Sequence, residues 1–260
     1  MRTYHQLTDP DRSGLADQIG AQRKRVAERL ATVRRIVAVM SGKGGVGKSY
    51  VTAHLARGLA RAGRSVGVLD ADLNGPTIPG LLQVPQTAQP PAIGLDGVKC
   101  ISMGHFLDDG APLAFTGPAA ESFVWRGAME ASALREFLSD VEWGELDVLL
   151  LDLPPGMQRY IELCDILGNA PAVLTVTIPT PESRDAVRRA MRAAVDHGSE
   201  LLGIVENMVG GELKGSAAAD LALEFRTPVL ARIPWHPSPD DWSELASRLP
   251  EARGPRPQAP

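Results

Sequence analysis

A glycine-rich stretch between two apolar segments constrains this chain more than any other feature. Residues 40–49 (MSGKGGVGKS) contain the pattern G-x-x-x-x-G-K-[ST]. The apolar run 36–40 before it predicts a buried strand, and residues 50–62 after it carry apolar side chains at helical spacing. The glycines therefore fall at a strand-to-helix turn, the setting in which this pattern binds phosphate.

The chemistry of this turn favours ATP or GTP over the alternative of a tight turn without a ligand. Glycines lack a Cβ atom, so successive backbone N–H groups can converge on phosphate oxygens at the helix N-terminus. Lys48 is placed to reach the β- and γ-phosphates, and the Ser49 hydroxyl suits Mg²⁺. The nucleotide-binding residues predicted in this loop are Gly42, Lys43, Gly44, Gly45, Val46, Gly47, Lys48, Ser49 and Tyr50. Lys43 is one of only five lysines in the chain, and a general phosphate-binding loop does not need it.

Length and composition favour one large α/β domain without a disulfide framework. A chain of 260 residues with 44% hydrophobic content can bury a full core. Its net charge of −4 gives no overall signal for a nucleic-acid or membrane partner. No apolar run is long enough for a transmembrane helix, and no apolar signal core follows residue 5, so we expect a soluble, cytoplasmic protein. Two cysteines, Cys100 and Cys164, cannot form a disulfide scaffold.

Segments of different character flank the predicted core at residues 35–249. In the N-terminal extension, residues 1–34, Ser13 can cap a basic helix whose apolar positions include Ile19 and Val26. We expect this helix to dock on the sheet with its basic face in solvent; a membrane-surface or nucleic-acid contact is the alternative. Residues 250–260 contain four prolines and are predicted to be disordered.

Carboxylates follow two predicted strands. The strand at 65–70 is followed by Asp72, where it can position the water that attacks the γ-phosphate; a turn cap is the alternative role. The apolar strand 146–152 ends at Asp152, which is expected to orient water on Mg²⁺. Gly156 lets a backbone N–H approach the γ-phosphate. The predicted metal-binding residues are therefore Ser49 and Asp152.

The rest of the chain alternates strands and helices. Residues 85–97 are rich in turn-forming residues and predict a surface loop. The alternation of strands and helices predicts a doubly wound, mostly parallel sheet with helices on both faces. The arginines at 184, 188 and 192 share one helical face, expected to be solvated rather than a partner-binding patch. Further strands are predicted at 98–103, 172–178, 201–208 and 229–233, and helices at 128–141, 181–196, 216–225 and 240–248.

Five motifs in one order give the chain a family resemblance. It resembles the Mrp/ApbC group of deviant-Walker P-loop ATPases, relatives of MinD, ParA and the nitrogenase iron protein within the SIMIBI class. The resemblance extends from about Arg35 to Pro237. The motifs are residues 42–49, 70–76, 124–127, 152–156 and 205–208.

This resemblance implies a slow Mg-dependent ATPase that works as a nucleotide-switched homodimer. Lys43 matches the signature lysine that reaches the partner subunit's phosphates, so with Lys48 and Asp72 it completes the catalytic set. Asp152 matches the Walker B residue. Asn207 and the loop after Pro234 match positions near the adenine base.

The chain also departs from the group. Relatives that carry a [4Fe–4S] cluster place a C-P-x-C pair soon after the fifth motif, whereas residues 209–214 contain no cysteine, so cluster binding in the family manner is doubtful. Tyr50 replaces a small hydroxyl residue, and its ring is expected to point away from the phosphates. Residues 157–159 replace the usual Thr and Asp, which predicts an altered switch response.

Three purposes fit these observations. The first is iron–sulfur or other metallocofactor assembly, acting on an unidentified client protein. The second is a MinD/ParA-like positioning switch, and the third is a nucleotide-dependent binding module with little hydrolysis.

Overall fold

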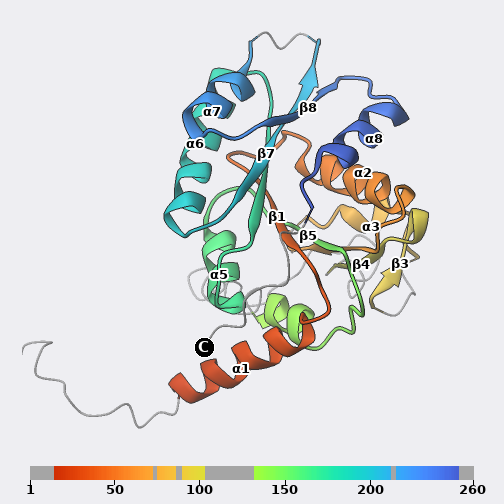
Figure 1. The fold of residues 1–260 in the computed structure, drawn as a ribbon, viewed down its shortest axis with the longest axis vertical. Helices are drawn as coiled ribbons and strands as arrows, with labels where there is room; N and C mark the ends of the chain where they lie inside the picture. Colours follow the sequence, from red (N-terminus) through yellow and green to blue (C-terminus); the bar gives the residue numbers. More distant parts are fainter. Residues whose placement is uncertain (1–14, 73–74, 86–89, 103–131, 212–214, 252–260) are drawn as a thin grey trace, which may run out of the picture.

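A computed structural model describes residues 15–72, 75–85, 90–102, 132–211 and 215–251. At its centre lies an eight-stranded sheet with the strand order β3-β4-β2-β5-β1-β6-β7-β8 (Figure 1). The strands are β1 (Ile36–Ser41), β2 (Val66–Asp70), β3 (Ala92–Ile93), β4 (Lys99–Ser102), β5 (Val148–Asp152), β6 (Ala172–Thr177), β7 (Leu201–Val209) and β8 (Val229–Pro234).

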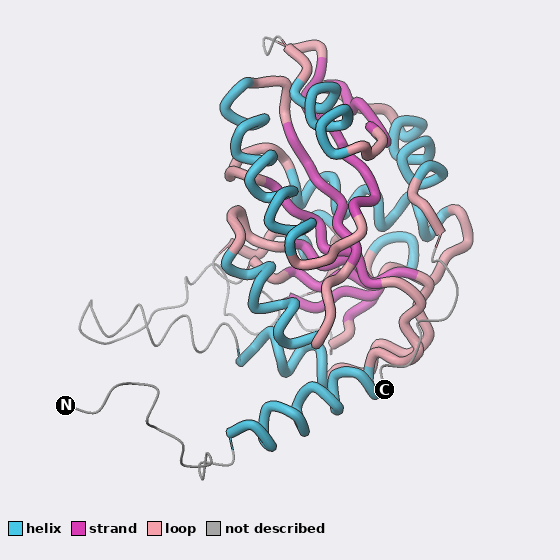
Figure 2. The backbone as a smooth tube through the Cα atoms, turned by 60° about the vertical axis from the view of Figure 1, so that its left-hand side comes forward, coloured by secondary structure: helices cyan, strands magenta, loops and turns pink. Residues whose placement is uncertain are grey.

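Helices cover both faces of the sheet (Figure 2). Side chains alternate between the faces along each strand, so Val37 and Val39 of β1 enter one core while Ala38 and Met40 enter another. The first core is completed by α2, α3 and α8, and the second by α1, α5 and part of α6. The helices are α1 (Leu15–Arg29), α2 (Lys48–Arg61), α3 (Ile78–Leu81), α5 (Gln158–Leu167), α6 (Pro181–Asp196), α7 (Ala217–Phe225) and α8 (Pro239–Arg248).

This architecture confirms the predicted doubly wound, mostly parallel sheet. Strands β1, β2 and β4 to β8 all run parallel to one another. Only β3 is antiparallel, to β4. Within the surface loop predicted at 85–97, residues 92–93 form the short strand β3 and Leu95–Gly97 form a 3₁₀ turn, neither of which was predicted.

The basic helix α1 docks as expected. Val26 is buried in the second core, and the Arg23 side chain donates a hydrogen bond to the Asp165 carbonyl of α5 at 2.8 Å. Ile19, expected on the apolar face, is instead 43% exposed. Ser13, the predicted cap, lies outside the described residues.

Other predicted elements fall partly outside the described residues. The helix predicted at 128–141 is helical over 132–139, where Leu134 and Leu138 are buried. Motif 124–127 lies outside the described part of the chain. Arg35 donates hydrogen bonds to the carbonyls of Pro250 and Glu251, while the remainder of the predicted disordered tail, 252–260, is not described.

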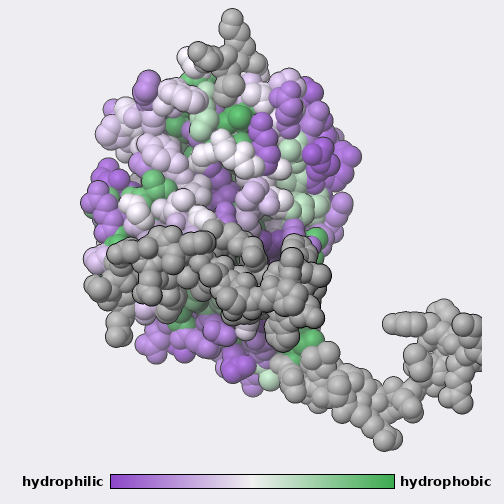
Figure 3. All heavy atoms as spheres, turned by 180° about the vertical axis from the view of Figure 1, so that it is seen from behind, coloured by the Kyte–Doolittle hydropathy of each residue, from purple (hydrophilic) through white to green (hydrophobic). Residues whose placement is uncertain are grey.

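The arginines of α6 face solvent and bind α7. Arg184 lies 3.0 Å from Asp220, and both Arg188 and Arg192 contact Glu224. On the rear of the molecule, hydrophobic residues form small separate groups among hydrophilic ones (Figure 3). Among the described residues, no helix is both long and apolar enough to cross a membrane.

Candidate nucleotide-binding site

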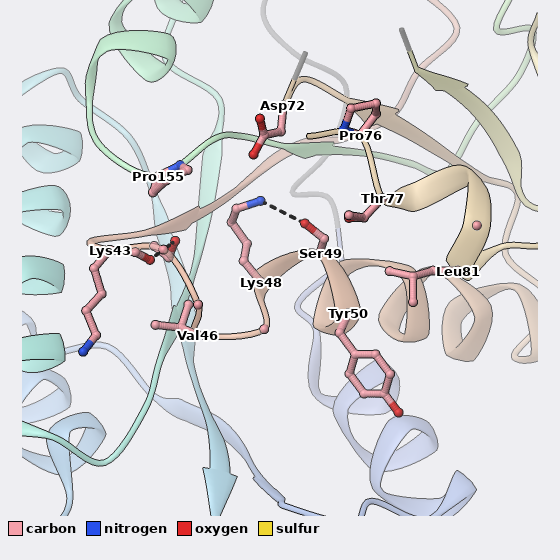
Figure 4. Close-up of a pocket in the computed structure, with 15 residues that line it drawn as sticks. Lys43, Val46, Lys48, Ser49, Tyr50, Asp72, Pro76, Thr77, Leu81 and Pro155 are labelled. Atoms are coloured by element: carbon pink, nitrogen blue, oxygen red, sulfur yellow. Dashed lines mark hydrogen bonds between the residues drawn. The ribbon is translucent and has the colours of Figure 1, made fainter. Parts of the chain in front are cut away.

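The phosphate-binding loop, residues 42–49, lies at the carboxyl end of the central strand β1. The chain leaves β1 for β2 on one side, whereas β6 pairs with β1 on the other, so this position is a topological switch point where α/β sheets bind ligands. A cavity of about 690 Å³ opens here, large enough for a nucleotide's phosphates (Figure 4). This phosphate cavity is lined by Ser41, Lys43, Gly44, Gly45, Val46, Gly47, Lys48, Ser49, Tyr50, Asp72, Pro76, Thr77, Gly80, Leu81 and Pro155.

Two glycines of the loop are required by close contacts. A Cβ atom on Gly42 would lie 2.2 Å from the backbone carbonyl carbon of Ala186 in α6. Gly47 has a φ of 77°, and a Cβ there would lie 2.4 Å from the Asn207 side-chain nitrogen. The loop therefore packs closely between α6 and the end of β7, with no room for a side chain at either glycine.

Asn207 supports the loop from below. Its side-chain amide donates a hydrogen bond to the Val46 carbonyl at 2.9 Å, and the residue is buried. Pro234 ends β8 and is half-buried, and neither residue lines the phosphate cavity. Their predicted proximity to adenine stays a prediction.

Lys48 and Asp152 form a buried ion pair at the cavity floor. The Lys48 amine lies 2.7 Å from Asp152 Oδ1, and Asp152 is fully buried. The Ser49 hydroxyl donates to the other carboxylate oxygen at 2.5 Å. The first turn of α2 is therefore fastened to the end of β5.

The residues at this floor fit a triphosphate with a divalent cation. A hydroxyl and a carboxylate side by side, Ser49 and Asp152, are the hard oxygen ligands that Mg²⁺ prefers. The Lys48 amine and the loop's N–H groups are the donors that phosphate oxygens accept. Lys48 is only 7% exposed in its side chain, so its charge acts where water is largely excluded.

Asp72 and Lys43 point in different directions. The Asp72 carboxylate faces into the phosphate cavity on the side of the Lys48 amine, whereas the Lys43 side chain extends away from Lys48 (Figure 4). Gly156, in the loop after β5, has its N–H directed at the Ser41 carbonyl, 3.5 Å away. The structure thus brings Lys48, Ser49 and Asp72 together with Asp152, and leaves Lys43 apart.

Two buried polar residues beside the cavity, Thr52 and Asp70, were not predicted as site residues from the sequence. Thr52 lies one turn after Lys48 in α2, and its hydroxyl donates to Asp152 Oδ1 at 2.8 Å. Asp70 is the register neighbour of Asp152 across β2 and β5. Burial, followed by the charge of Asp152, raises the pKa of Asp70 above its ordinary value. Helical spacing from Lys48 could have identified Thr52.

The Tyr50 ring points away from the Lys48 amine and the Ser49 hydroxyl (Figure 4). Its ring lies 4.1 Å from that of His54 and 5.6 Å from that of Trp242, centroid to centroid. Burial lowers the pKa of His54, so this aromatic group favours the neutral imidazole.

The cysteines and the segment after Gly156 differ from the group's pattern in structure as well. Cys100 belongs to the first core and Cys164 packs against the second, on opposite faces of the sheet. Burial raises the pKa of both thiols, which disfavours the thiolate that binds metal. These residues do not fit a shared iron–sulfur cluster. Arg159, one of the three residues at 157–159 that replace the group's Thr and Asp, is buried and pairs with Glu162 at 2.6 Å.

Comparison with known proteins places this site in a family. Residues 32–249 match the family model described as ParA, NUBPL iron-transfer P-loop NTPase. An "iron-sulfur cluster carrier protein" of Methanocaldococcus jannaschii is 38% identical over 251 residues, covering 87% of this chain and 80% of the relative.

Solved structures agree with this assignment. A nucleotide-binding protein of Archaeoglobus fulgidus in complex with ADP has a TM-score of 0.66 and 32% identity, covering 87% of this chain and 92% of that one. The cell division ATPase MinD of Pyrococcus furiosus has a TM-score of 0.57 and 22% identity, covering 83% and 98%, and shares the fold.

Proposed function

The chain belongs to the ParA family of NUBPL iron-transfer P-loop NTPases, and from this membership we propose that it is a slow, Mg-dependent ATPase. We further propose that it acts as a nucleotide-switched homodimer in iron–sulfur or other metallocofactor assembly. The observation that carries the proposal is the buried Lys48–Asp152 pair, joined by the Ser49 hydroxyl, beneath a cavity into which Asp72 points.

In the proposed reaction, ATP draws the Lys48 amine from Asp152 to the β- and γ-phosphates, while the loop's N–H groups bind the remaining oxygens. Ser49 and Asp152 would hold Mg²⁺, whose charge offsets that of the phosphate oxygens. Asp72 accepts a hydrogen bond from a water and aims its oxygen at the γ-phosphorus. The water oxygen forms a bond to the γ-phosphorus while the bond from that phosphorus to the β–γ bridging oxygen breaks. ADP and inorganic phosphate leave, one water proton stays on the phosphate, and the other is released to solvent.

The orientation of Lys43 supports the homodimer. Because its side chain extends away from Lys48, the Lys43 amine can enter the site of a facing subunit, as an arginine finger does. The alternative is a solvent-facing lysine of a monomeric ATPase.

Three variants test this mechanism by calorimetry, phosphate release and light scattering. Lys48→Ala should lose ATP binding, because it removes the cation of the cavity floor. Lys43→Ala should keep most ATP affinity but lose ATP-dependent dimerisation and hydrolysis. Asp72→Ala should bind ATP and accumulate as a dimer without turnover. A Lys43→Ala protein that dimerises and hydrolyses normally would rule out the lysine in trans, and unchanged affinity in Lys48→Ala would show that the loop is only a turn.

The role in metallocofactor assembly rests on the family and on relatives named as iron–sulfur cluster carriers. Since Cys100 and Cys164 do not fit a shared cluster, we propose that this chain assists assembly on a client or partner protein. Anaerobic reconstitution followed by iron and sulfide analysis tests this: the expected result is no stoichiometric cluster. Four irons per dimer, lost in Cys100→Ser or Cys164→Ser, would instead make the chain a carrier.

A further inference from the structure

We propose that Asp70 is a positioning residue for ATP hydrolysis, which holds the segment between β2 and α3 so that Asp72 faces the phosphate cavity. This inference rests on the proposed function and adds to it a residue that does not touch the substrate. It starts from the contacts of one buried carboxylate.

Asp70 binds both ends of the segment that carries Asp72. Its Oδ1 accepts a hydrogen bond from the Asp72 N–H at 3.2 Å. Its Oδ2 accepts from the N–H groups of Thr77 and Ile78 at 3.0 and 3.1 Å. The Ser102 hydroxyl of β4 donates to the same oxygen at 3.3 Å. One side chain therefore fixes where this segment leaves the sheet and where it returns.

The anchored segment forms one wall of the phosphate cavity. Asp72 and Thr77, whose N–H groups bind Asp70, both line the cavity, as does Pro76 between them. Asp70 itself is fully buried and does not line it. Its influence on the γ-phosphate must therefore pass through the segment, above all through the Asp72 carboxylate.

Asp70 and Asp152 are register neighbours, but they bind different parts of the chain. The side-chain donors to Asp152, which include Ser49 and Thr52, come from α2. Three of the donors to Asp70 are backbone N–H groups of the segment after β2. Burial makes the loss of such hydrogen bonds costly. The P-loop helix and the Asp72 segment are thus fastened to different carboxylates.

The test replaces Asp70 by Asn, which keeps the shape but offers one acceptor atom in place of two. The amide NH₂ would face N–H donors at one end of the segment, so that end should detach. We expect kcat to fall about tenfold or more, from the loss of one or two buried hydrogen bonds, while ADP affinity and KM for ATP stay within about twofold. Amide hydrogens at the detached end should exchange faster, either that of Asp72 or those of Thr77 and Ile78.

Two comparisons separate positioning from a general structural role. Ser102→Ala removes the hydroxyl donor of β4 to Asp70 but no N–H of the segment. Its kcat for ATP should stay within about twofold of the wild type, because this neutral hydrogen bond does not hold the segment. Because Asp70 acts through Asp72, adding Asp70→Asn to Asp72→Asn should slow hydrolysis no further. If Asp70→Asn fails to fold, Asp70→Glu, which displaces the carboxylate by one methylene, carries the same expectations.

The outcomes distinguish this inference from the proposed function. An Asp70→Asn protein with wild-type kcat and amide exchange would overturn the positioning role, as would equal losses of ADP affinity and kcat. A wild-type protein that hydrolyses no ATP would refute the ATPase instead, and amide exchange at Asp72, Thr77 and Ile78 would still show whether Asp70 anchors the segment.

Discussion

Replacing Thr52 by Val tests how firmly Asp152 is held by α2. Thr52 is fully buried, and its hydroxyl lies 2.8 Å from Asp152 Oδ1 and 2.9 Å from the Lys48 carbonyl. A hydroxyl has one proton, and the charged carboxylate is the stronger acceptor. Valine fills nearly the same volume, so the substitution removes the hydrogen bond and creates little cavity.

The expected cost follows from these contacts. A hydrogen bond to a charged group contributes about 1.5–3 kcal/mol to stability. Asp152 keeps Lys48 and Ser49 as partners, so the lower part of that range applies, and we expect a loss of about 2 kcal/mol. For a protein of this size, that loss lowers the melting temperature by roughly 4–8 °C.

Thermal unfolding without nucleotide measures this loss, and Thr52→Ser, which keeps the hydroxyl, is the matched control. Magnesium-dependent ADP affinity should fall as well, because under the proposed mechanism Lys48 and Ser49 leave Asp152 for phosphate and Mg²⁺ and Thr52 remains its donor. A melting temperature of Thr52→Val within about 1 °C of the wild type would refute the reasoning.

Two other substitutions test the loop and the aromatic group beside it. Gly47→Ala should weaken ATP binding, measured by calorimetry, more than Gly45→Ala does. Both glycines have positive φ, which costs an alanine about 1–2 kcal/mol of backbone strain. Only at Gly47 would the new Cβ also collide with Asn207. Equal losses would mean that strain alone matters. Because burial lowers the pKa of His54 below its unfolded value of 6.5, its neutral form stabilises the fold above that pH and the contribution is lost as pH falls through 6.5. The free energy of unfolding of His54→Phe, measured by denaturant titration, should therefore change less between about pH 7 and pH 5 than that of the wild type. An equal change in both proteins would contradict this.

The parts of the site set by local backbone were predictable from sequence. Loop 42–49 lies between β1 and α2 as expected, because glycine spacing and apolar periodicity are local signals. The adjacency of Asp70 and Asp152 was not predictable, because it depends on β2 pairing with β5, far along the chain. Periodicity identifies strands but does not determine their order in the sheet.

Other departures have physical causes. Strand β3 has two residues in a region rich in turn formers, and its pairing with β4 is a tertiary contact that propensity does not register. Ile19 has helical spacing but is exposed, because α1 packs through Val26 and lies at the edge of the molecule (Figure 1). An apolar position on a peripheral helix need not reach the core.

The pairing of β2 with β5 also bears on how the site responds to nucleotide. Drawing Lys48 away from Asp152 removes a positive charge beside two neighbouring carboxylates, yet it breaks none of the N–H bonds to Asp70. The segment carrying Asp72 can therefore keep its position while the first turn of α2 rearranges. We infer that the sheet supplies a fixed position for Asp72, and that a divalent cation beside Asp152 replaces the positive charge of Lys48 when nucleotide binds.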